Sequence, residues 1–123
     1  MTVTAPRPVR PSARAWAGLA VLFLPTLLVA IDNTVLSFAL PAISAAVSPS
    51  ATQQLWIVDA YPLVLAGLLV TMGTLGDRIG RRRTLLIGVV GFGAVSLAAA
   101  FATDAAQLVA ARALLGFFGA MLM

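Results

Sequence analysis

The sequence predicts an all-α membrane protein with four transmembrane helices. Of its 123 residues, 61% are hydrophobic and only 10% are charged, whereas soluble domains carry about 25% charged residues. The apolar residues also gather in runs long enough to cross a bilayer, whose hydrocarbon core of about 30 Å requires roughly 20 residues of helix. A water-soluble core is excluded, because too few polar residues remain to cover it.

The membrane domain is expected to cover residues 15–123, after a basic cytoplasmic tail. Its four helices are predicted at about 15–41, 53–75, 84–102 and 105–123. Trp16 lies at the start of the first run, and this run is too long for the apolar core of a signal peptide. The tail at residues 1–14 contains three prolines and three arginines.

Short polar segments separate the predicted helices. Ser48-Pro49-Ser50 breaks the chain after the first helix, and Ser50 followed by Gln53 is typical of a capping box. Trp56 and Tyr61 are expected near the outer end of the second helix. Asp104, in the turn before the fourth helix, is predicted to cap that helix.

Small residues are frequent in the third predicted helix, where Gly88, Gly91 and Gly93 favour close helix packing. The fourth helix is still apolar at Met123, with no polar flank after it. We therefore expect the chain to be the N-terminal part of a larger protein.

Arginine placement predicts the orientation in the membrane. Arginines precede the first helix and follow the second, whereas the segments at 42–52 and 102–104 contain none. Because basic residues stay on the cytoplasmic side, the N-terminus and residues 76–83 are predicted to face the cytoplasm of a multi-pass protein in the cell membrane.

The composition also limits the chemistry. The chain has no Cys, His, Lys or Glu, so thiolate metal sites are excluded, and proton exchange within the membrane must use aspartate. The sequence shows no phosphate-binding loop, metal-ligand cluster or nucleophile–base set. We therefore expect neither an enzyme nor a cofactor, metal or nucleic-acid site.

Three ionisable residues lie within the apolar runs, namely Asp32, Asp59 and Arg112. Each costs about 2.5–3.5 kcal/mol at the centre of a membrane helix, so such residues usually face a bundle interior or a watery cavity. Asp32 flanks a polar stripe that includes Asn33 and Ser37. Arg112 cannot lose its proton and needs an acidic or carbonyl partner.

Each of these residues also has a purely structural interpretation. Asp32 could be paired with a later helix without any transport role. Asp59 could contact water at the outer edge of the membrane, and Arg112 could extend toward an interface. Gly116 and Gly119, which share a helical stripe with Arg112, are expected to be packing residues.

Residues 73–83 read Gly-Thr-Leu-Gly-Asp-Arg-Ile-Gly-Arg-Arg-Arg. This segment resembles the signature loop between the second and third helices of the major facilitator superfamily. The matching positions are Gly73, Leu75, Asp77, Arg78, Gly80, Arg81 and Arg82. The resemblance implies that the four helices form most of the first bundle of that fold, and that the loop gates its conformational change. Alternatively, its arginines only set the orientation.

Two further segments resemble the fourteen-span drug:proton antiporters of this family. Residues 32–41 resemble their first-helix motif, with Ser37 in place of the usual Asn, and residues 54–63 resemble the start of their second helix. Arg112 and Gly116 match a fourth-helix motif linked to proton coupling, although Leu115 and Phe118 depart from it.

The resemblance implies a proton-coupled multidrug efflux transporter that works by alternating access. Its partners would be the bilayer, protons, lipophilic and mainly cationic small molecules, and the remaining helices. The implied pathway residues are Asp32, Asn33, Asp59 and Arg112, and the implied gating residues are Gly73, Asp77, Arg78, Gly80, Arg81 and Arg82. A nutrient importer of the same family remains an alternative, as does a self-contained four-span protein with a structural or regulatory role.

Overall fold

The computed structural model describes residues 11–123, which form four α-helices and no strand. These are α1 (Ala13–Val47), α2 (Ala51–Ile79), α3 (Arg81–Ala100) and α4 (Ala105–Leu122). Each is long and apolar enough to cross a membrane. The predicted all-α membrane fold is therefore confirmed, whereas Arg7 and Arg10 of the predicted tail lie outside the described residues.

Helix α1 is longer than the predicted first helix. It begins after Ser12, whose Oγ accepts a hydrogen bond from the Ala15 N–H, and it continues through Pro25 and Pro41. It ends at Ser48, a residue in the left-handed region with φ of 44°, which is a common way to end a helix.

Helix α2 begins with the predicted capping box. The Gln53 N–H donates to the Ser50 Oγ over 3.2 Å, and the Ser50 N–H donates to the Gln53 Oε1 over 3.0 Å. Gln54 also donates a side-chain hydrogen bond to Ser44 of α1 over 2.9 Å. This contact joins the adjoining ends of α1 and α2.

The arginine-rich segment is a tight corner and not the loop expected over residues 76–83. Helix α2 continues to Ile79 and α3 begins at Arg81, so only Gly80 separates them. Gly80 has φ 106° and ψ 127°, a conformation that residues with a Cβ rarely adopt. Its N–H still donates to the Gly76 carbonyl over 2.9 Å. The predicted gating residues therefore lie on two helix ends that meet at one glycine.

The start of α4 differs from the prediction for Asp104. Asp104 occupies the capping position, but its side chain makes no capping hydrogen bond. Instead, the Gln107 side chain accepts a hydrogen bond from the Thr103 N–H over 3.1 Å. The side-chain cap predicted for Asp104 is thus wrong, although Asp104 is the N-cap residue of α4.

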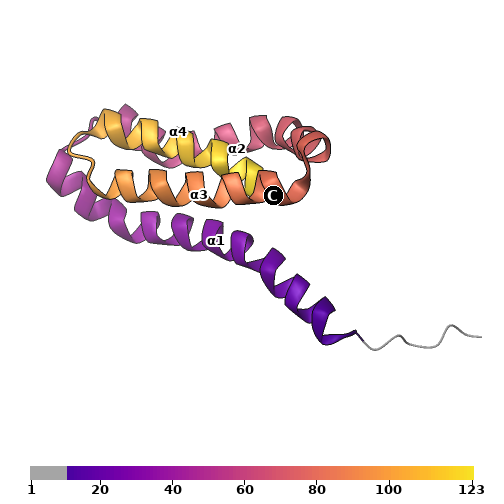
Figure 1. Ribbon diagram of the computed structural model, residues 1–123. Helices are drawn as coiled ribbons and strands as arrows, with labels where there is room; N and C mark the ends of the chain where they lie inside the picture. Colours follow the sequence, from indigo (N-terminus) through magenta and orange to yellow (C-terminus); the bar gives the residue numbers. More distant parts are fainter. Residues whose placement is uncertain (1–10) are drawn as a thin grey trace, which may run out of the picture.

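Helix α4 is the centre of the packing. It lies against both α2 and α3, whereas α1 contacts α4 over a short stretch and meets α2 at the bond between Ser44 and Gln54. Figure 1 shows α2, α3 and α4 side by side, with α1 running away from them toward its N-terminus. The buried apolar cluster contains Val29, Tyr61, Phe92, Leu115 and Leu122.

Glycines set the close approach of α3 to α4, as predicted. A Cβ on Gly88 would lie 3.1 Å from side-chain atoms of Leu122 and Met121, and one on Gly91 would meet the Phe118 ring. Gly93 faces open space, so its predicted packing role is not seen among the described helices.

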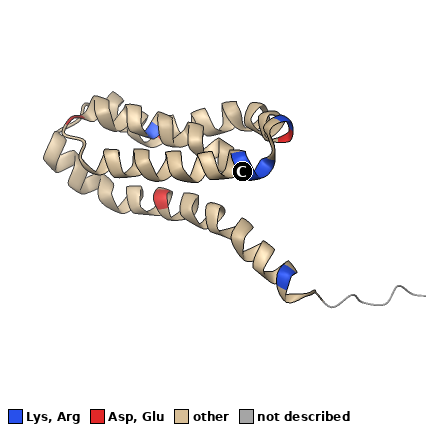
Figure 2. Ribbon diagram, viewed as in Figure 1, with Lys and Arg blue, Asp and Glu red and all other residues tan. Residues whose placement is uncertain are grey.

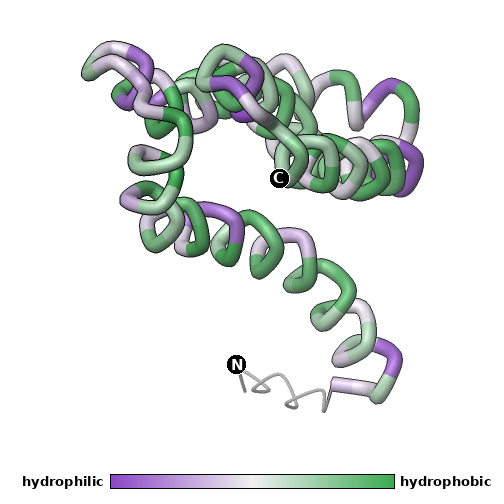
Figure 3. Tube along the Cα trace, turned by 90° about the vertical axis from the view of Figure 1, so that its left-hand side faces the viewer, coloured by the Kyte–Doolittle hydropathy of each residue, from purple (hydrophilic) through white to green (hydrophobic). Residues whose placement is uncertain are grey.

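The outer surface of the helices is apolar. Large hydrophobic side chains are exposed along all four helices, and Phe38 of α1 is 82% exposed. Figure 3 shows hydrophobic residues along the full length of the trace, with most hydrophilic residues near the helix ends. Such a surface suits lipid or further apolar helices, because neither competes for hydrogen bonds.

Candidate functional site

Two opposite charges lie midway along the helices. Figure 2 shows a blue segment within α4 and a red segment within α1, away from the charged helix ends. These are Arg112 and Asp32, which are 80 residues apart in the chain. The fold therefore brings together the first and the last of the three ionisable residues found in the apolar runs.

The two residues form a buried ion pair. Arg112 Nη1 lies 2.6 Å from Asp32 Oδ2, and the side chains are 5% and 16% exposed. The acidic partner expected for Arg112 is therefore present. Its guanidinium is buried between helices and does not extend toward the membrane interface. At such low exposure the attraction is weakly screened, and each charge depends on the other.

Arg112 makes two more hydrogen bonds. Its Nε donates to the Ile57 carbonyl of α2 over 3.1 Å, and its Nη2 donates to the Asn33 Oδ1 over 3.5 Å. The guanidinium carbon lies 4.6 Å from the centre of the Tyr61 ring, within the range of a cation–π contact. One arginine of α4 thereby contacts both α1 and α2.

Asn33 is oriented by its own helix. Its Nδ2 donates to the Val29 carbonyl over 3.0 Å, which leaves its Oδ1 to face Arg112. Ser37, the other member of the polar stripe singled out in the sequence, donates to the Asn33 backbone carbonyl over 3.1 Å. Of the predicted stripe, Asn33 therefore contributes its side chain to the Arg112 site.

Asp59 lies apart from this cluster. It is exposed on α2, beside a shallow hollow lined by residues of the same helix, among them Trp56 and Pro62. Within residues 11–123 it makes no ion pair. The structure thus does not bring Asp59 together with Asp32 and Arg112.

The charges at the corner between α2 and α3 are exposed. Arg81 Nε lies 3.3 Å from Asp77 Oδ1 across Gly80, and the side chains are 88% and 63% exposed. Pairs this exposed contribute about 0–1 kcal/mol. Arg78 and Arg82 are exposed as well, so the predicted gating charges all lie at the surface of the described helices.

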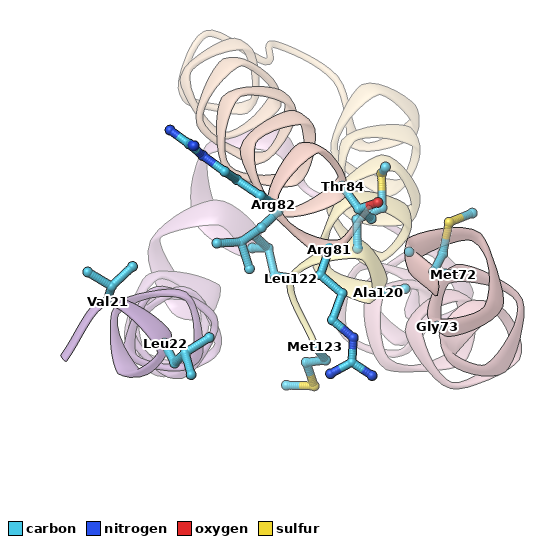
Figure 4. A pocket seen from close by; sticks show the side chains of 13 residues that line it. Val21, Leu22, Met72, Gly73, Arg81, Arg82, Thr84, Ala120, Leu122 and Met123 are labelled. Atoms are coloured by element: carbon cyan, nitrogen blue, oxygen red, sulfur yellow. The ribbon is translucent and has the colours of Figure 1, made fainter. Parts of the chain in front are cut away.

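A cavity of about 410 Å³ lies beside this corner. It is lined by apolar side chains of all four helices, including Leu22, Met72 and Leu122, and by Gly73. Figure 4 shows Arg81 and Arg82 at the same end of the helices as Met123, with their side chains extending in different directions. Three of the predicted gating residues, Gly73, Arg81 and Arg82, therefore line a space between helix ends.

Tyr61 is the site residue that sequence reasoning missed. It was expected only near an outer membrane surface, yet it is 2% exposed and lies against Arg112. The stripe of Arg112, Gly116 and Gly119 on α4 was the available signal. A Cβ on Gly116 would lie 2.6 Å from the Tyr61 carbonyl oxygen, and one on Gly119 would lie 3.0 Å from the Tyr61 hydroxyl. The predicted packing role of both glycines is confirmed, and its partner is Tyr61.

Comparison with known proteins agrees with the motifs. The sequence profile of the Major Facilitator Superfamily matches residues 22–123. The chain is 68% identical over 118 residues to the multidrug efflux pump LfrA of Mycolicibacterium smegmatis. The matched region covers 96% of the chain and 23% of LfrA.

Two more distant relatives match over a similar range. The methyl viologen resistance protein SmvA of Salmonella typhimurium is 46% identical over 110 residues, or 89% of the chain and 22% of SmvA. The puromycin resistance protein pur8 of Streptomyces alboniger is 42% identical over 112 residues, or 91% of the chain and 22% of pur8. The chain thus spans less than a quarter of each of these relatives. The match of the family profile to residues 22–123 shows that the chain, with its four membrane-length helices, belongs to the Major Facilitator Superfamily.

Proposed function

We propose that the whole protein exports lipophilic, mainly cationic, small molecules across the plasma membrane in exchange for protons. The observation that carries this proposal is the buried pair of Arg112 and Asp32, which joins α4 to α1 over 2.6 Å. Inside its membrane segments the chain offers aspartate for proton exchange, because it contains no His or Glu.

The names of the relatives favour export. They describe a multidrug efflux pump and proteins of methyl viologen and puromycin resistance. These names support efflux over the alternative of nutrient import. The length of the relatives supports a longer transporter over a self-contained four-span protein, and the family supports transport over an enzymatic reaction.

The chemistry of the pair provides two states. Ionised Asp32 holds Arg112 and thereby links α1 to α4. A proton on Asp32 removes its charge, and Arg112 keeps the Ile57 carbonyl, the Asn33 amide oxygen and the Tyr61 ring. In this scheme protonation of Asp32 weakens the link between α1 and α4, while the guanidinium keeps its other partners.

The free energy of breaking this ion pair is of the same order as the free energy that a conformational switch requires. Breaking a buried ion pair by removing one partner costs about 3–5 kcal/mol. A difference of about 5.5 kcal/mol moves a two-state equilibrium from 1:99 to 99:1. Because Arg112 keeps its other contacts, proton binding at Asp32 supplies part of the bias for alternating access in this scheme, and substrate supplies the remainder. Asp59 would act elsewhere in the pathway, because it does not contact the pair.

Transport by the wild-type protein in proteoliposomes tests this proposal. With the membrane potential clamped, we expect an imposed pH gradient to drive accumulation of a cationic dye, and we expect nigericin to abolish it. Liposomes without protein are the control. Dye movement that follows a sodium gradient, or that persists after nigericin, would show that protons are not the coupling ion.

We also propose that the corner around Gly80, with Gly73, Asp77, Arg78, Arg81 and Arg82, gates the conformational change on the cytoplasmic side. Asp77→Asn removes the single acid among four arginines, so we expect dye export to fall several-fold. Arg82→Lys, which keeps the charge at an exposed position, is the matched control and should export nearly normally. Full export by Asp77→Asn would leave the corner with an orientation role alone.

The same variants should keep their orientation. A cysteine at Ser48 should react with an impermeant reagent in intact cells, and one at Ser12 should not, because arginines are retained on the cytoplasmic side. The opposite labelling pattern would refute the proposed orientation.

A further inference from the structure

We propose that Tyr61 is a positioning residue of the proton site, whose ring holds Arg112 and whose hydroxyl becomes a hydrogen-bond partner of Asp32 when Asp32 is protonated. This inference rests on the proposed proton coupling, and it gives a role to a tyrosine within residues 54–63, the segment that resembles the second helix of the antiporters.

The first observation is an unsatisfied polar atom. Tyr61 is 2% exposed, and its hydroxyl has no hydrogen-bond partner. Within residues 11–123 it is the buried side-chain N or O atom that lacks one. Buried polar groups are nearly always paired, so an unpaired hydroxyl beside an ionisable cluster indicates a partner that is engaged in another state.

The second observation is the set of groups around Tyr61. The Arg112 guanidinium of α4 lies over the Tyr61 ring at 4.6 Å, and Arg112 in turn bonds Asp32 and Asn33 of α1 over 2.6 and 3.5 Å. Asp59 of its own helix is exposed, and the arginines of α3 lie at the far end of that helix, Arg81 to Arg83. The ionisable groups that face Tyr61 are therefore Asp32 and Arg112.

The third observation is the close approach of the α4 backbone to the Tyr61 hydroxyl at Gly119. A Cβ on Gly119 would lie 3.0 Å from the Tyr61 hydroxyl and 3.4 Å from its ring. The hydroxyl is therefore bounded by the backbone of α4 on one side. Within residues 11–123, the polar side chains linked to Tyr61 through Arg112 are those of Asp32 and Asn33.

The two states differ in whether Asp32 can donate a hydrogen bond. While Asp32 is ionised it has only acceptor atoms, and its Oδ2 is bonded to Arg112. Once Asp32 carries a proton, its attraction to Arg112 weakens and its O–H can donate to the Tyr61 hydroxyl oxygen. The ring stays against the guanidinium throughout. Tyr61 thus stabilises the protonated state more than the ionised state.

Tyr61→Phe tests the hydroxyl, because it removes that group and keeps the ring. In the full-length protein we expect a maximal rate of dye export within about two-fold of wild type. The midpoint of its pH profile should move to lower pH by about half a unit to one unit, as expected for one lost hydrogen bond. A merely structural role would change protein yield or maximal rate and would leave the midpoint in place.

Tyr61→Leu tests the ring, and we expect it to reduce the maximal rate at least ten-fold at equal protein yield. Gly119→Ala, which pushes on the hydroxyl, should move the midpoint in the same direction as Tyr61→Phe. Gly93→Ala is the matched control, because a Cβ there meets nothing within 4 Å, and its profile should coincide with wild type.

The outcomes separate this inference from the proposed function. If wild-type export follows the pH gradient while the profile of Tyr61→Phe coincides with that of wild type, the hydroxyl has no such role. If Tyr61→Leu exports as well as Tyr61→Phe, the ring does not position Arg112. If wild-type export ignores the pH gradient, both proposals are wrong.

Discussion

Asp32→Asn is expected to abolish pH-gradient-driven export of a cationic dye by the full-length protein. The substitution keeps the size of the side chain and removes the carboxylate that lies 2.6 Å from Arg112. The site then has no carboxylate to exchange a proton. Export should fall at least a hundred-fold and should no longer depend on pH.

A structural loss must be separated from this loss of coupling. Asp32→Asn leaves the Arg112 charge buried without its acid, which costs about 3–5 kcal/mol in comparable sites. The double variant Asp32→Asn with Arg112→Gln carries neither charge, so we expect it to recover thermal stability while remaining inactive in proton-driven export. Asp104→Asn makes the same chemical change at an exposed residue without a capping bond, and it should behave as wild type. Wild-type rates and pH dependence in Asp32→Asn would exclude Asp32 as the coupling group.

Gly116→Ala is expected to disturb the packing of α4 on α2 more than any other glycine-to-alanine change between these two helices. The added Cβ would lie 2.6 Å from the Tyr61 carbonyl oxygen, 3.0 Å from the Val64 Cβ and 3.3 Å from the Leu65 nitrogen. Two of these atoms belong to the backbone, so a side-chain rotation cannot relieve the contact and the helices must separate. Overpacking of this kind typically costs about 1–3 kcal/mol.

The thermal stability of the detergent-solubilised protein measures this effect. We expect a clearly lower unfolding temperature and weaker export, since Arg112 donates to Ile57 on the same stretch of α2. Gly93→Ala, on the open side of α3, should change neither quantity. An unchanged unfolding temperature in Gly116→Ala would mean that α2 and α4 lie farther apart than described here.

The helices and most of their ends are determined by residues that are neighbours in the sequence. Hydrophobic runs of bilayer length predicted the four helices, and the capping box of Ser50 and Gln53 predicted the start of α2, because both depend on neighbouring residues. Asp104 shows the limit of local reasoning. Its position in the chain is that of a helix cap, but its side chain makes no capping hydrogen bond, and position alone does not reveal whether that bond forms.

The corner at Gly80 shows a similar limit. The sequence placed a charged segment between two apolar runs, and a charged run predicts a loop at the membrane surface. Whether arginines continue a helix depends on whether their charges are solvated beyond its end. Here they are exposed, so α2 and α3 extend until a single glycine reverses the chain.

The sequence by itself determined that the protein is helical, lies in a membrane and belongs to its family, because these properties follow from composition, periodicity and a motif of fixed spacing. It also determined that Arg112 requires an acid or a carbonyl, since an arginine cannot lose its proton. Only the tertiary structure decided that Asp32 is this acid and Asp59 is not, and that Tyr61 adjoins the pair. Those contacts join residues on three helices, and they depend on how closely α4 approaches α1 and α2. Side-chain packing between the helices sets these distances, and no local sequence pattern reveals them.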